Sequence, residues 1–293
     1  METQVDRSKF IGGSDIAAIL GISPWGSAVD LWLDKIKPLS RDETKVQTRG
    51  KRLESYIIEM IEEEYGVQVS GRNQRYVDPT VPFFAAQIDA EIALLPPIIE
   101  NLEIKTVHPF KANEWGDLQT DQLPLHYLAQ VQWGLGVTGR DLCRIFALIG
   151  DDLKPYIVQR DEATIEAMRV RAADFWQRYV VAREQPPLDY SDPHTLEVLK
   201  RLYPGTDGTE IEATQGEEMY RHTMQDAQVK ADQYLNMVAG CKAHLLNVMG
   251  EAALLKFSDG KALRRKLIKV KGYTVADREQ MDLRFITLKG DKE

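Results

Sequence analysis

Two carboxylates and a lysine stand at a spacing that could build a site for phosphodiester chemistry. Glu103 and Lys105 are two residues apart in an apolar stretch, so on a β-strand both side chains lie on one face. Asp89 precedes the Pro96-Pro97 turn, and in a hairpin it would lie beside the strand of Glu103. An Asp and a Glu that converge offer the oxygen ligands that Mg²⁺ prefers. Such a metal polarises a phosphodiester and lowers the pKa of a bound water, with Lys105 beside it to hold or activate that water.

The same residues have a plainer interpretation, in which a surface strand pairs its charges across the hairpin. Two features of the sequence favour the metal site. Glu103 lies between Leu102 and Ile104, and Asp89 follows the apolar run 83–88. In such apolar surroundings a charged group needs a partner, and a metal ion would be one. Charge pairing remains the alternative.

Glu54 is a candidate third carboxylate. In a helix predicted over 48–65, three isoleucines follow it by three, four and seven positions, so Glu54 projects from the apolar face. A charge on a buried stripe is costly unless a metal or a cation meets it. The alternative is that Glu54 lies at the edge of the stripe and pairs with Arg49 or Lys51.

The elements that position these residues are indicated by hydrophobic periodicity and by turn signals. They alternate between helices and strands, which predicts an α/β fold with a mixed central sheet flanked by helices. We predict short helices within 1–37, a helix at 48–65, strands at 74–78, 83–94 and 98–106, a helix at 124–138, strands at 142–149 and 155–159, and a helix at 161–183.

Prolines and glycines gather between Pro186 and Gly208, which is typical of a connecting segment. We therefore predict three parts. A catalytic domain would span 1–188, a linker 189–210, and a C-terminal arm with a long helix and a basic β-hairpin 211–293.

Within the arm, apolar residues recur at alternating steps of four and three from Ala227 to Leu255, which is a heptad pattern. A helix of that length spans about 40 Å. Its core positions include three alanines, a tyrosine and a cysteine, so we favour packing on a partner surface, another subunit, over an isolated two-stranded coil. The stretches 262–275 and 281–288 alternate like a long hairpin.

The arm also carries a basic stretch, an exception in a chain of net charge −8. Attraction to phosphate is one interpretation, and a solvated hairpin edge protected by lysines is the other. The cations are Lys256, Lys261, Arg264, Arg265, Lys266, Lys269 and Lys271.

Composition narrows the class of protein. The 293 residues are 43% hydrophobic and 28% charged, an ordinary balance for a soluble protein. The negative net charge argues against a general nucleic-acid coat protein, but a nuclease needs only a local basic track. The two cysteines lie far apart, which argues against a zinc or iron–sulfur site. No run of 18 apolar residues exists, so we expect no membrane association and a cytoplasmic protein.

Four motifs in this order resemble the YqaJ-type viral recombinases. They are IGGSDIAAILGISPW at 11–25, RGKRLE at 49–54, LEIKT at 102–106 and YLAQVQ at 127–132. Their order and spacing also resemble the lambda exonuclease-like nucleases of the PD-(D/E)XK type. The likeness covers roughly residues 7–185.

This resemblance implies a restriction-endonuclease-like core and a role for each acidic residue. Asp89 and Glu103 would bind Mg²⁺, with Mn²⁺ as a substitute, together with the backbone carbonyl of Ile104. Lys105 would act on the attacking water. Glu54 would assist the metal or its waters, so the catalytic set is Glu54, Asp89, Glu103 and Lys105.

The resemblance also implies a pocket for the 5′-phosphate of the cut strand. Arg7, Ser14 and Gln130 fall at the matching positions, and the first two have the expected spacing of seven. For Arg7 the alternative is an exposed cation near the N-terminus.

The activity implied is hydrolysis of linear duplex DNA from a 5′-phosphorylated end, which leaves 3′ single strands for phage-type recombination. The implied partners are double-stranded DNA ends, a single-strand annealing protein and further copies of the chain, in a phage or prophage setting. The alternatives are an endonuclease or single-strand nuclease on the same core, and a catalytically inactive module that binds DNA ends.

Several aromatic residues and histidines have less specific interpretations. The spacing of Trp25 and Trp32 predicts one buried helical face, and His108 and His126 are interpreted as polar or packing residues. Trp115 lies in a predicted loop, where stacking on DNA is the alternative to packing.

Overall fold

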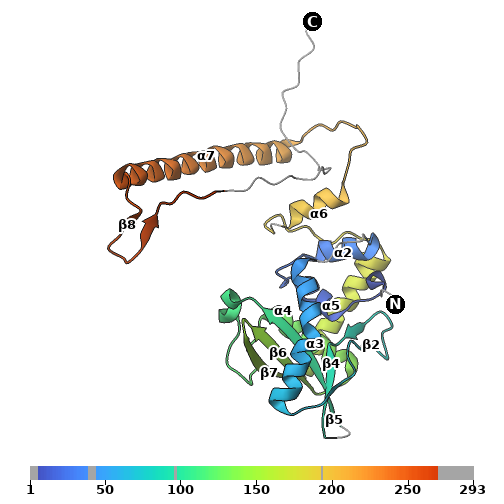
Figure 1. The fold of residues 1–293 in the computed structure, drawn as a ribbon. Coiled ribbons are helices and arrows are strands. Elements are labelled where there is room, and N and C mark those ends of the chain that lie inside the picture. The colour runs from blue at the N-terminus through green and yellow to red at the C-terminus, as the bar shows by residue number, and fades with distance from the viewer. Residues whose placement is uncertain (1–5, 39–43, 96–97, 193, 270–293) are drawn as a thin grey trace. The chain divides into compact units, whose positions relative to one another are not determined.

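The computed structural model describes residues 6–38, 44–95, 98–192 and 194–269. The chain divides into two compact units, Met1–Tyr203 and Pro204–Glu293 (Figure 1). Each unit is described by itself.

The first unit is built on a mixed five-stranded sheet in the order β1-β4-β5-β6-β7. β5 and β6 are parallel, and the other neighbouring pairs are antiparallel. The strands are β1 (Val69–Ser70), β4 (Ala90–Leu95), β5 (Ile98–Val107), β6 (Leu142–Ile149) and β7 (Asp152–Gln159). The predicted α/β fold with a mixed sheet is confirmed.

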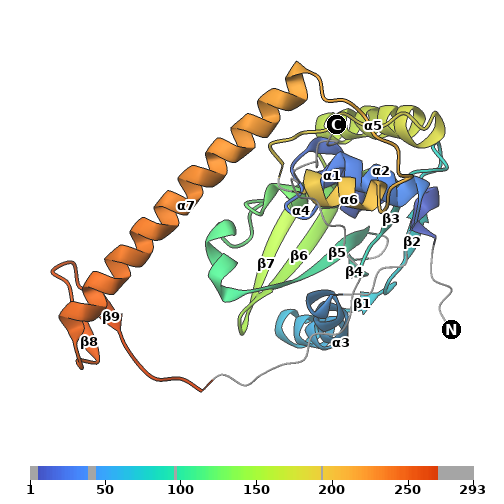
Figure 2. The same cartoon turned by 90° about the horizontal axis from the view of Figure 1, so that it is seen from above.

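Helices cover both faces of this sheet (Figure 2). α3 lies on one face, where Ile57, Ile58 and Ile61 pack against Leu102 and its neighbours. α1, α4 and α5 lie on the other face, over a larger core that includes Trp133. The helices are α1 (Gly13–Leu20), α2 (Ala28–Ile36), α3 (Lys45–Tyr65), α4 (Leu125–Thr138) and α5 (Glu162–Phe175), with the short helices η1 (Arg7–Lys9), η2 (Pro109–Glu114) and the π-helix η3 (Trp176–Val181).

Local sequence accounts for both ends of α3. The Thr44 hydroxyl accepts from the backbone N–H of Gln47, and the Gln47 side chain accepts from the Thr44 N–H, which is a capping box. The helix ends at Gly66, whose φ of 63° is in the left-handed region that glycine adopts without steric cost. Between these ends the isoleucine stripe fixes which face meets the sheet, so Glu54 is held at a defined place.

The strand predicted over 83–94 is two strands, which corrects that prediction. β3 (Ala85–Gln87) pairs with β2 (Arg75–Val77) in a separate two-stranded sheet, and β4 begins at Ala90. Ile88 and Asp89 continue the pairing beside β2, because the Ile88 N–H donates to the Gln74 carbonyl and the Asp89 carbonyl accepts from the Asn73 N–H. The pairing with β5 begins one residue later, at Ala90. Asp89 therefore lies at a junction between two sheets.

A helix lies within the predicted linker, so the interpretation of 189–210 as a connecting segment is wrong in part. α6 (Thr195–Leu202) buries Val198 in the core of the first unit. Arg201 pairs with Asp30 at 3.2 Å and with Asp34 at 2.5 Å, both on α2. The prolines and glycines flank this short amphipathic helix and conceal it in the sequence.

The second unit contains a long helix and a small hairpin. α7 spans Gln215–Met249, so the heptad prediction up to Leu255 runs too far: Gly250, with a φ of 52°, ends the helix. Leu255 belongs instead to β8 (Leu254–Lys256), which pairs with β9 (Ala262–Arg264). Along α7, which is described in full, Met249 alone is buried.

Up to residue 269, the hairpin of the arm is the short one formed by β8 and β9, and only 262–264 of the predicted strand 262–275 are in a strand. The remainder of that prediction, with Lys271, lies outside the described residues. None of the helices in the described ranges has the length and apolar character that a membrane span requires.

Candidate active site

The hairpin of β4 and β5 brings the two predicted metal ligands together. Ala90 pairs with Leu102 in antiparallel register, which places Asp89 across from Glu103. Asp89 is oriented by the backbone, because its Oδ2 accepts a hydrogen bond from the Ile104 N–H at 2.7 Å. The geometry expected for a residue before the turn and one after it is present.

Glu103 is the centre of the side-chain network. It is 5% exposed, and its Oε1 accepts from Lys105 Nζ at 2.5 Å and from Gln130 Nε2 at 2.6 Å. Lys105 is on the same strand face, as predicted, and its Nζ lies 5.1 Å from the centre of the Tyr127 ring. α4 supplies both Gln130 and Tyr127, so this helix covers the part of β5 that carries Glu103 and Lys105.

Glu54 is joined to the hairpin through Asn73. Glu54 Oε1 accepts from Asn73 Nδ2 at 2.9 Å, while the Asn73 backbone N–H donates to the Asp89 carbonyl at 2.8 Å. Asn73 has a φ of 55°, a conformation that asparagine tolerates better than most residues. Among the described residues, Glu54 makes this bond to Asn73 and no pair with Arg49, while the charge of Lys51, the other predicted partner, lies near enough to lower the pKa of Glu54 in part. Sequence reasoning missed Asn73, although its place beside Gly71 is a turn signal.

Burial raises the pKa values of all three carboxylates. Burial, with the charges of Asp89 and Glu54, raises the pKa of Glu103 to about 7, although the Lys105 ammonium acts in the opposite direction. Burial also raises the pKa of Asp89, against the effects of Lys105 and of the Ile104 N–H. For Glu54, burial and the charge of Asp89 raise the pKa. Lys105 offsets part of the charge of Asp89 and Glu103, and Arg72 and Lys51 offset part of the charge of Glu54, yet all three pKa values stay raised.

Lys105 responds in the opposite sense. Burial tends to lower the pKa of its ammonium, but the Glu103 and Asp89 carboxylates outweigh burial and hold it above its ordinary value. In this arrangement Lys105 is a cation that donates hydrogen bonds.

The donor set fits a hard divalent cation. The bonds described above occupy one oxygen each of Glu54, Asp89 and Glu103, and the excess negative charge would be offset by a bound cation. No three His, Cys, Asp or Glu side chains of the described ranges converge closely enough to form a ligand set by themselves. A metal here would need backbone or water oxygens as well, which is the usual environment of Mg²⁺.

These residues line a cavity of about 1020 Å³ that also contains the predicted phosphate ligands. Three elements contribute them: η1, the beginning of α1, and the middle of α4. The predicted site residues in the lining are Arg7, Ser14, Glu54, Asp89, Glu103 and Gln130.

Arg7 is anchored at this cavity although it is half-exposed. Its Nη2 donates to Ser14 Oγ at 2.6 Å and lies 3.3 Å from Asp15 Oδ1. The buried Lys35, whose side chain is 3% exposed, donates to Asp15 Oδ2 at 2.8 Å and to the carbonyls of Arg7 and Phe10, each at 2.6 Å. Lys35 and Asp15, which sequence reasoning missed, thus fix the segment that carries Arg7.

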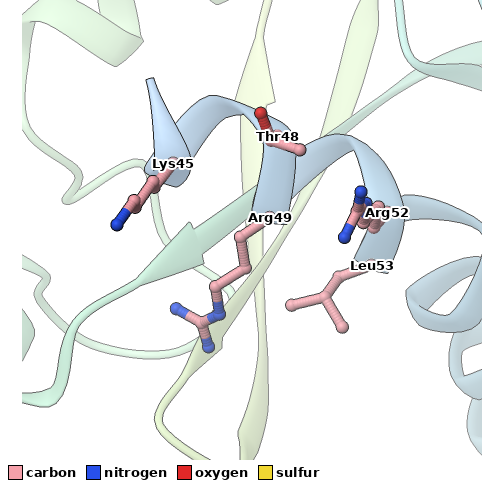
Figure 3. Close-up of a pocket in the computed structure, with 5 residues that line it drawn as sticks. All are labelled: Lys45, Thr48, Arg49, Arg52 and Leu53. Atoms are coloured by element: carbon pink, nitrogen blue, oxygen red, sulfur yellow. The ribbon is translucent and has the colours of Figure 1, made fainter. Parts of the chain in front are cut away.

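Further cations lie beside the site. Arg75 lines the same cavity, with its guanidinium carbon 4.4 Å from the centre of the Phe10 ring. The first half of α3 borders a second hollow, of about 430 Å³ (Figure 3). Its lining residues are Lys45, Thr48, Arg49, Arg52 and Leu53.

The structure overturns the prediction for Trp25 and decides between the two interpretations of Trp115. Trp25 is 65% exposed, because it lies in the connection between α1 and α2, where helical spacing does not apply. Trp115 is buried against Tyr127 and is thus a packing residue, so the stacking alternative for it is wrong. Trp32 is buried as predicted and donates from Nε1 to the Tyr179 carbonyl at 2.9 Å.

The two histidines have local roles in the structure. His108 Nδ1 accepts from the Phe110 N–H at 3.3 Å and caps η2. His126, near the beginning of α4, is half-buried and contacts Trp25 with ring centres 4.7 Å apart. Both agree with the interpretation as polar or packing residues.

Among solved structures, the chain is similar in fold to LHK-Exo, an alkaline exonuclease from Laribacter hongkongensis. The complex of LHK-Exo with dAMP matches with a TM-score of 0.50 and 19% identity, over 67% of this chain and 94% of that one. A second crystal structure of LHK-Exo matches with the same TM-score and 18% identity. The fold is thus that of the lambda exonuclease-like nucleases.

The sequence comparisons give the family. Residues 4–141 match the YqaJ-like viral recombinase domain. The YqaJ protein of Bacillus subtilis (strain 168) is 31% identical over 211 residues, which cover 70% of this chain and 64% of that relative. The chain thus contains a match to the YqaJ-like viral recombinase domain and is homologous to YqaJ, as the four motifs predicted.

Proposed function

We propose that the chain is a metal-dependent exonuclease that degrades linear duplex DNA from a 5′-phosphorylated end and leaves 3′ single strands for phage-type recombination. The observation that carries the proposal is the convergence of Asp89, Glu103 and Lys105 beside a cavity that also holds Arg7. The neighbour of similar fold is itself an alkaline exonuclease.

In this proposal Asp89 and Glu103 hold Mg²⁺, or Mn²⁺ in its place, with the Ile104 carbonyl, and Glu54 orients waters around it. The bound metal supplies Lewis acidity toward the phosphodiester and a more acidic water. Lys105 donates hydrogen bonds to the attacking water and offsets the negative charge that grows in the transition state.

The phosphate pocket supports the choice of a 5′ end. Arg7 and Ser14 are bonded to each other at the cavity wall, and a phosphate placed there would accept charge-assisted hydrogen bonds from the guanidinium. Gln130 reaches the same cavity while it bonds to Glu103, so it links the proposed pocket to the proposed metal site.

The basic half of α3 supports duplex DNA as the substrate. In the part of the chain that the structure describes, no carboxylate pairs with Arg49 or Arg52, and Lys45 lies beside them. Cations in such a row attract the phosphate backbone without regard to sequence. They give the local basic track that a chain of net charge −8 needs.

A single-strand annealing protein is the proposed partner, since a 3′ single strand is the product. A homo-oligomer is proposed as well, because α7 presents an apolar stripe to solvent.

The decisive experiment measures cleavage of end-labelled linear duplex in Mg²⁺ by the parent and by Asp89→Asn, Glu103→Gln and Lys105→Ala. Loss of a metal ligand or of the water-orienting cation should slow cleavage about a thousandfold. Glu166→Gln, at an exposed position of α5, is the control and should cleave like the parent. If a folded Lys105→Ala variant cuts as fast as the parent, the proposed site is wrong.

The choice of substrate separates the alternatives. Covalently closed circular duplex should resist the parent enzyme, and cleavage of it would indicate an endonuclease. Preference for single strands would indicate a single-strand nuclease. Tight binding of duplex ends without metal-dependent cleavage would indicate an inactive end-binding module.

A further inference from the structure

Trp25 is the exposed end of a connected set of aromatic rings that begins in the core. Tyr156 and Trp115 are both buried, with ring centres 5.1 Å apart. Trp115 lies 5.7 Å from Tyr127, which lies 5.9 Å from Trp25. Because the inner rings are fixed by the core, the exposed indole rests on a rigid base.

The same set of rings reaches the proposed catalytic residues. The Tyr127 ring contacts both Trp25 and Lys105, so one ring separates the indole from the catalytic ammonium. On α4, His126 and Gln130 are four residues apart and therefore share a face. His126 contacts Trp25, and Gln130 bonds to Glu103. Trp25 thus lies about one helical turn from the site.

The chemistry around Trp25 favours a nucleobase as its ligand. Aromatic side chains stack on bases of any sequence, because every base has a π-face. Near His126 lie Lys111, Glu114 and Lys105, which make the surroundings polar and mostly cationic. Such surroundings suit a base attached to a phosphate backbone better than an apolar protein surface.

We propose that Trp25 is a stacking platform for an unpaired base of the bound DNA strand, next to the phosphate that is cut. The inference rests on the proposed function, because it requires DNA at the site. A terminal base pair must open before one strand can enter a catalytic cavity, and that opening costs a few kcal/mol. Stacking on a preformed aromatic surface offsets part of that cost.

The test combines variants of Trp25 with DNA that lacks single bases. Affinity is measured with Ca²⁺ in place of Mg²⁺ for 5′-phosphorylated duplexes with one abasic nucleotide at each of the first few positions. The proteins are the parent, Trp25→Ala, Trp25→Phe and Tyr190→Ala, the last at an exposed aromatic residue outside the ring set. Thermal unfolding checks that every variant is folded.

At one of the tested positions, the abasic nucleotide should weaken DNA binding by the parent about tenfold, which corresponds to the loss of one stacked base. Trp25→Ala should bind intact DNA about tenfold more weakly and should show no further loss at that position, because both changes delete one interaction. Trp25→Phe should retain most of the affinity, and Tyr190→Ala should behave like the parent.

Two results would overturn the inference. One is equal affinity of the parent and Trp25→Ala for intact DNA. That result overturns the inference also where the variant binds a protein partner more weakly, since Trp25 would then contact a protein. The other is an abasic penalty of the same size in both proteins. If Trp25 and the abasic position are coupled in this way but the parent does not cleave duplex in Mg²⁺, the proposed function is wrong and the stacking site is still supported.

Discussion

Asn73 serves two partners through different atoms, its side chain for Glu54 and its backbone for Asp89. Asn73→Gly keeps the positive φ and the backbone bond, but removes the bond to Glu54. We expect cleavage to slow about tenfold, or about 1.4 kcal/mol of transition-state stabilisation, with weaker Mn²⁺ binding by electron paramagnetic resonance. Unchanged cleavage and Mn²⁺ binding would show that Asn73 is only a turn residue.

Asn73→Ala is the matched comparison. It loses the same side-chain bond, but alanine at a φ of 55° is strained. Its free energy of unfolding should therefore fall by about 1 kcal/mol below that of Asn73→Gly. Urea unfolding of the two variants measures this difference directly.

Arg7 gives a second prediction for a single residue. Removal of the 5′-phosphate from the substrate should slow the parent enzyme. It should slow Arg7→Ala much less, because the variant already lacks the contact that the phosphate makes. Single-turnover rates for the four combinations of enzyme and substrate measure the coupling, and equal slowing in both proteins would remove Arg7 from the pocket.

At the residue scale, the sequence identified charged side chains that lie in apolar stretches, where charged residues are rare. Asp89 and Glu103 were visible because a charge in an apolar run needs a partner. Asn73 was missed and Trp25 was wrongly predicted to be buried, because both residues lie in connecting segments whose conformation the sequence does not specify. Lys35 was hidden for another reason: a lysine on a helix reads as a surface residue until its three acceptors are known.

At the scale of elements, an ion pair joins α5 to the turn after β2. Asp78 is buried and bonds to Arg169, to the Thr80 hydroxyl and N–H, and to the Val81 N–H. Burial tends to raise the pKa of Asp78, but these hydrogen bonds outweigh it and hold the pKa well below the ordinary value. The charged form is therefore favoured in the folded state, and Asp78 stabilises the fold where it is ionised.

The sign of the pH dependence follows. The contribution of Asp78 is fully present above the unfolded pKa, about 3.9, and is lost as the pH falls through the folded pKa. Asp78→Asn should lower the free energy of unfolding at pH 7 by about 2 kcal/mol, and the difference from the parent should shrink below about pH 4. Urea unfolding across pH measures it, and a difference independent of pH would assign the effect to packing.

Element boundaries were predictable where one local rule dominated. α4 and β6 agree closely with their predicted ranges, because apolar periodicity and a closing glycine or turn set them. The division of 83–94 was not predictable, since an apolar run gives no sign that pairing in the five-stranded sheet begins only at Ala90. α6 was missed because it is short and stands among prolines.

At the scale of the molecule, α6 decides where the first unit ends. A chain shortened after Tyr203 keeps the burial of Val198 and the ion pairs of Arg201, whereas a chain shortened after Leu188 loses both. The second should be less stable than the first by about 2 kcal/mol, which is the contribution of one buried valine. Thermal unfolding compares the two, and equal midpoints would show that α6 adds nothing.

The last prediction concerns α7 and assembly. Its heptad stripe includes Tyr234 and Val238, which are exposed along with nearly all of the helix. An apolar stripe of this length is unfavourable in water, so we expect it to be buried between copies of the chain.

Val238→Asp places a charge in the stripe and should lower the molar mass measured by light scattering. Asn236→Asp, two residues away on the opposite face, is the matched control and should leave the mass unchanged. Because the proposed catalytic residues belong to the first unit, both variants should still show the proposed cleavage of duplex DNA at low salt. The same mass for the parent and Val238→Asp would show that the stripe does not hold copies of the chain together.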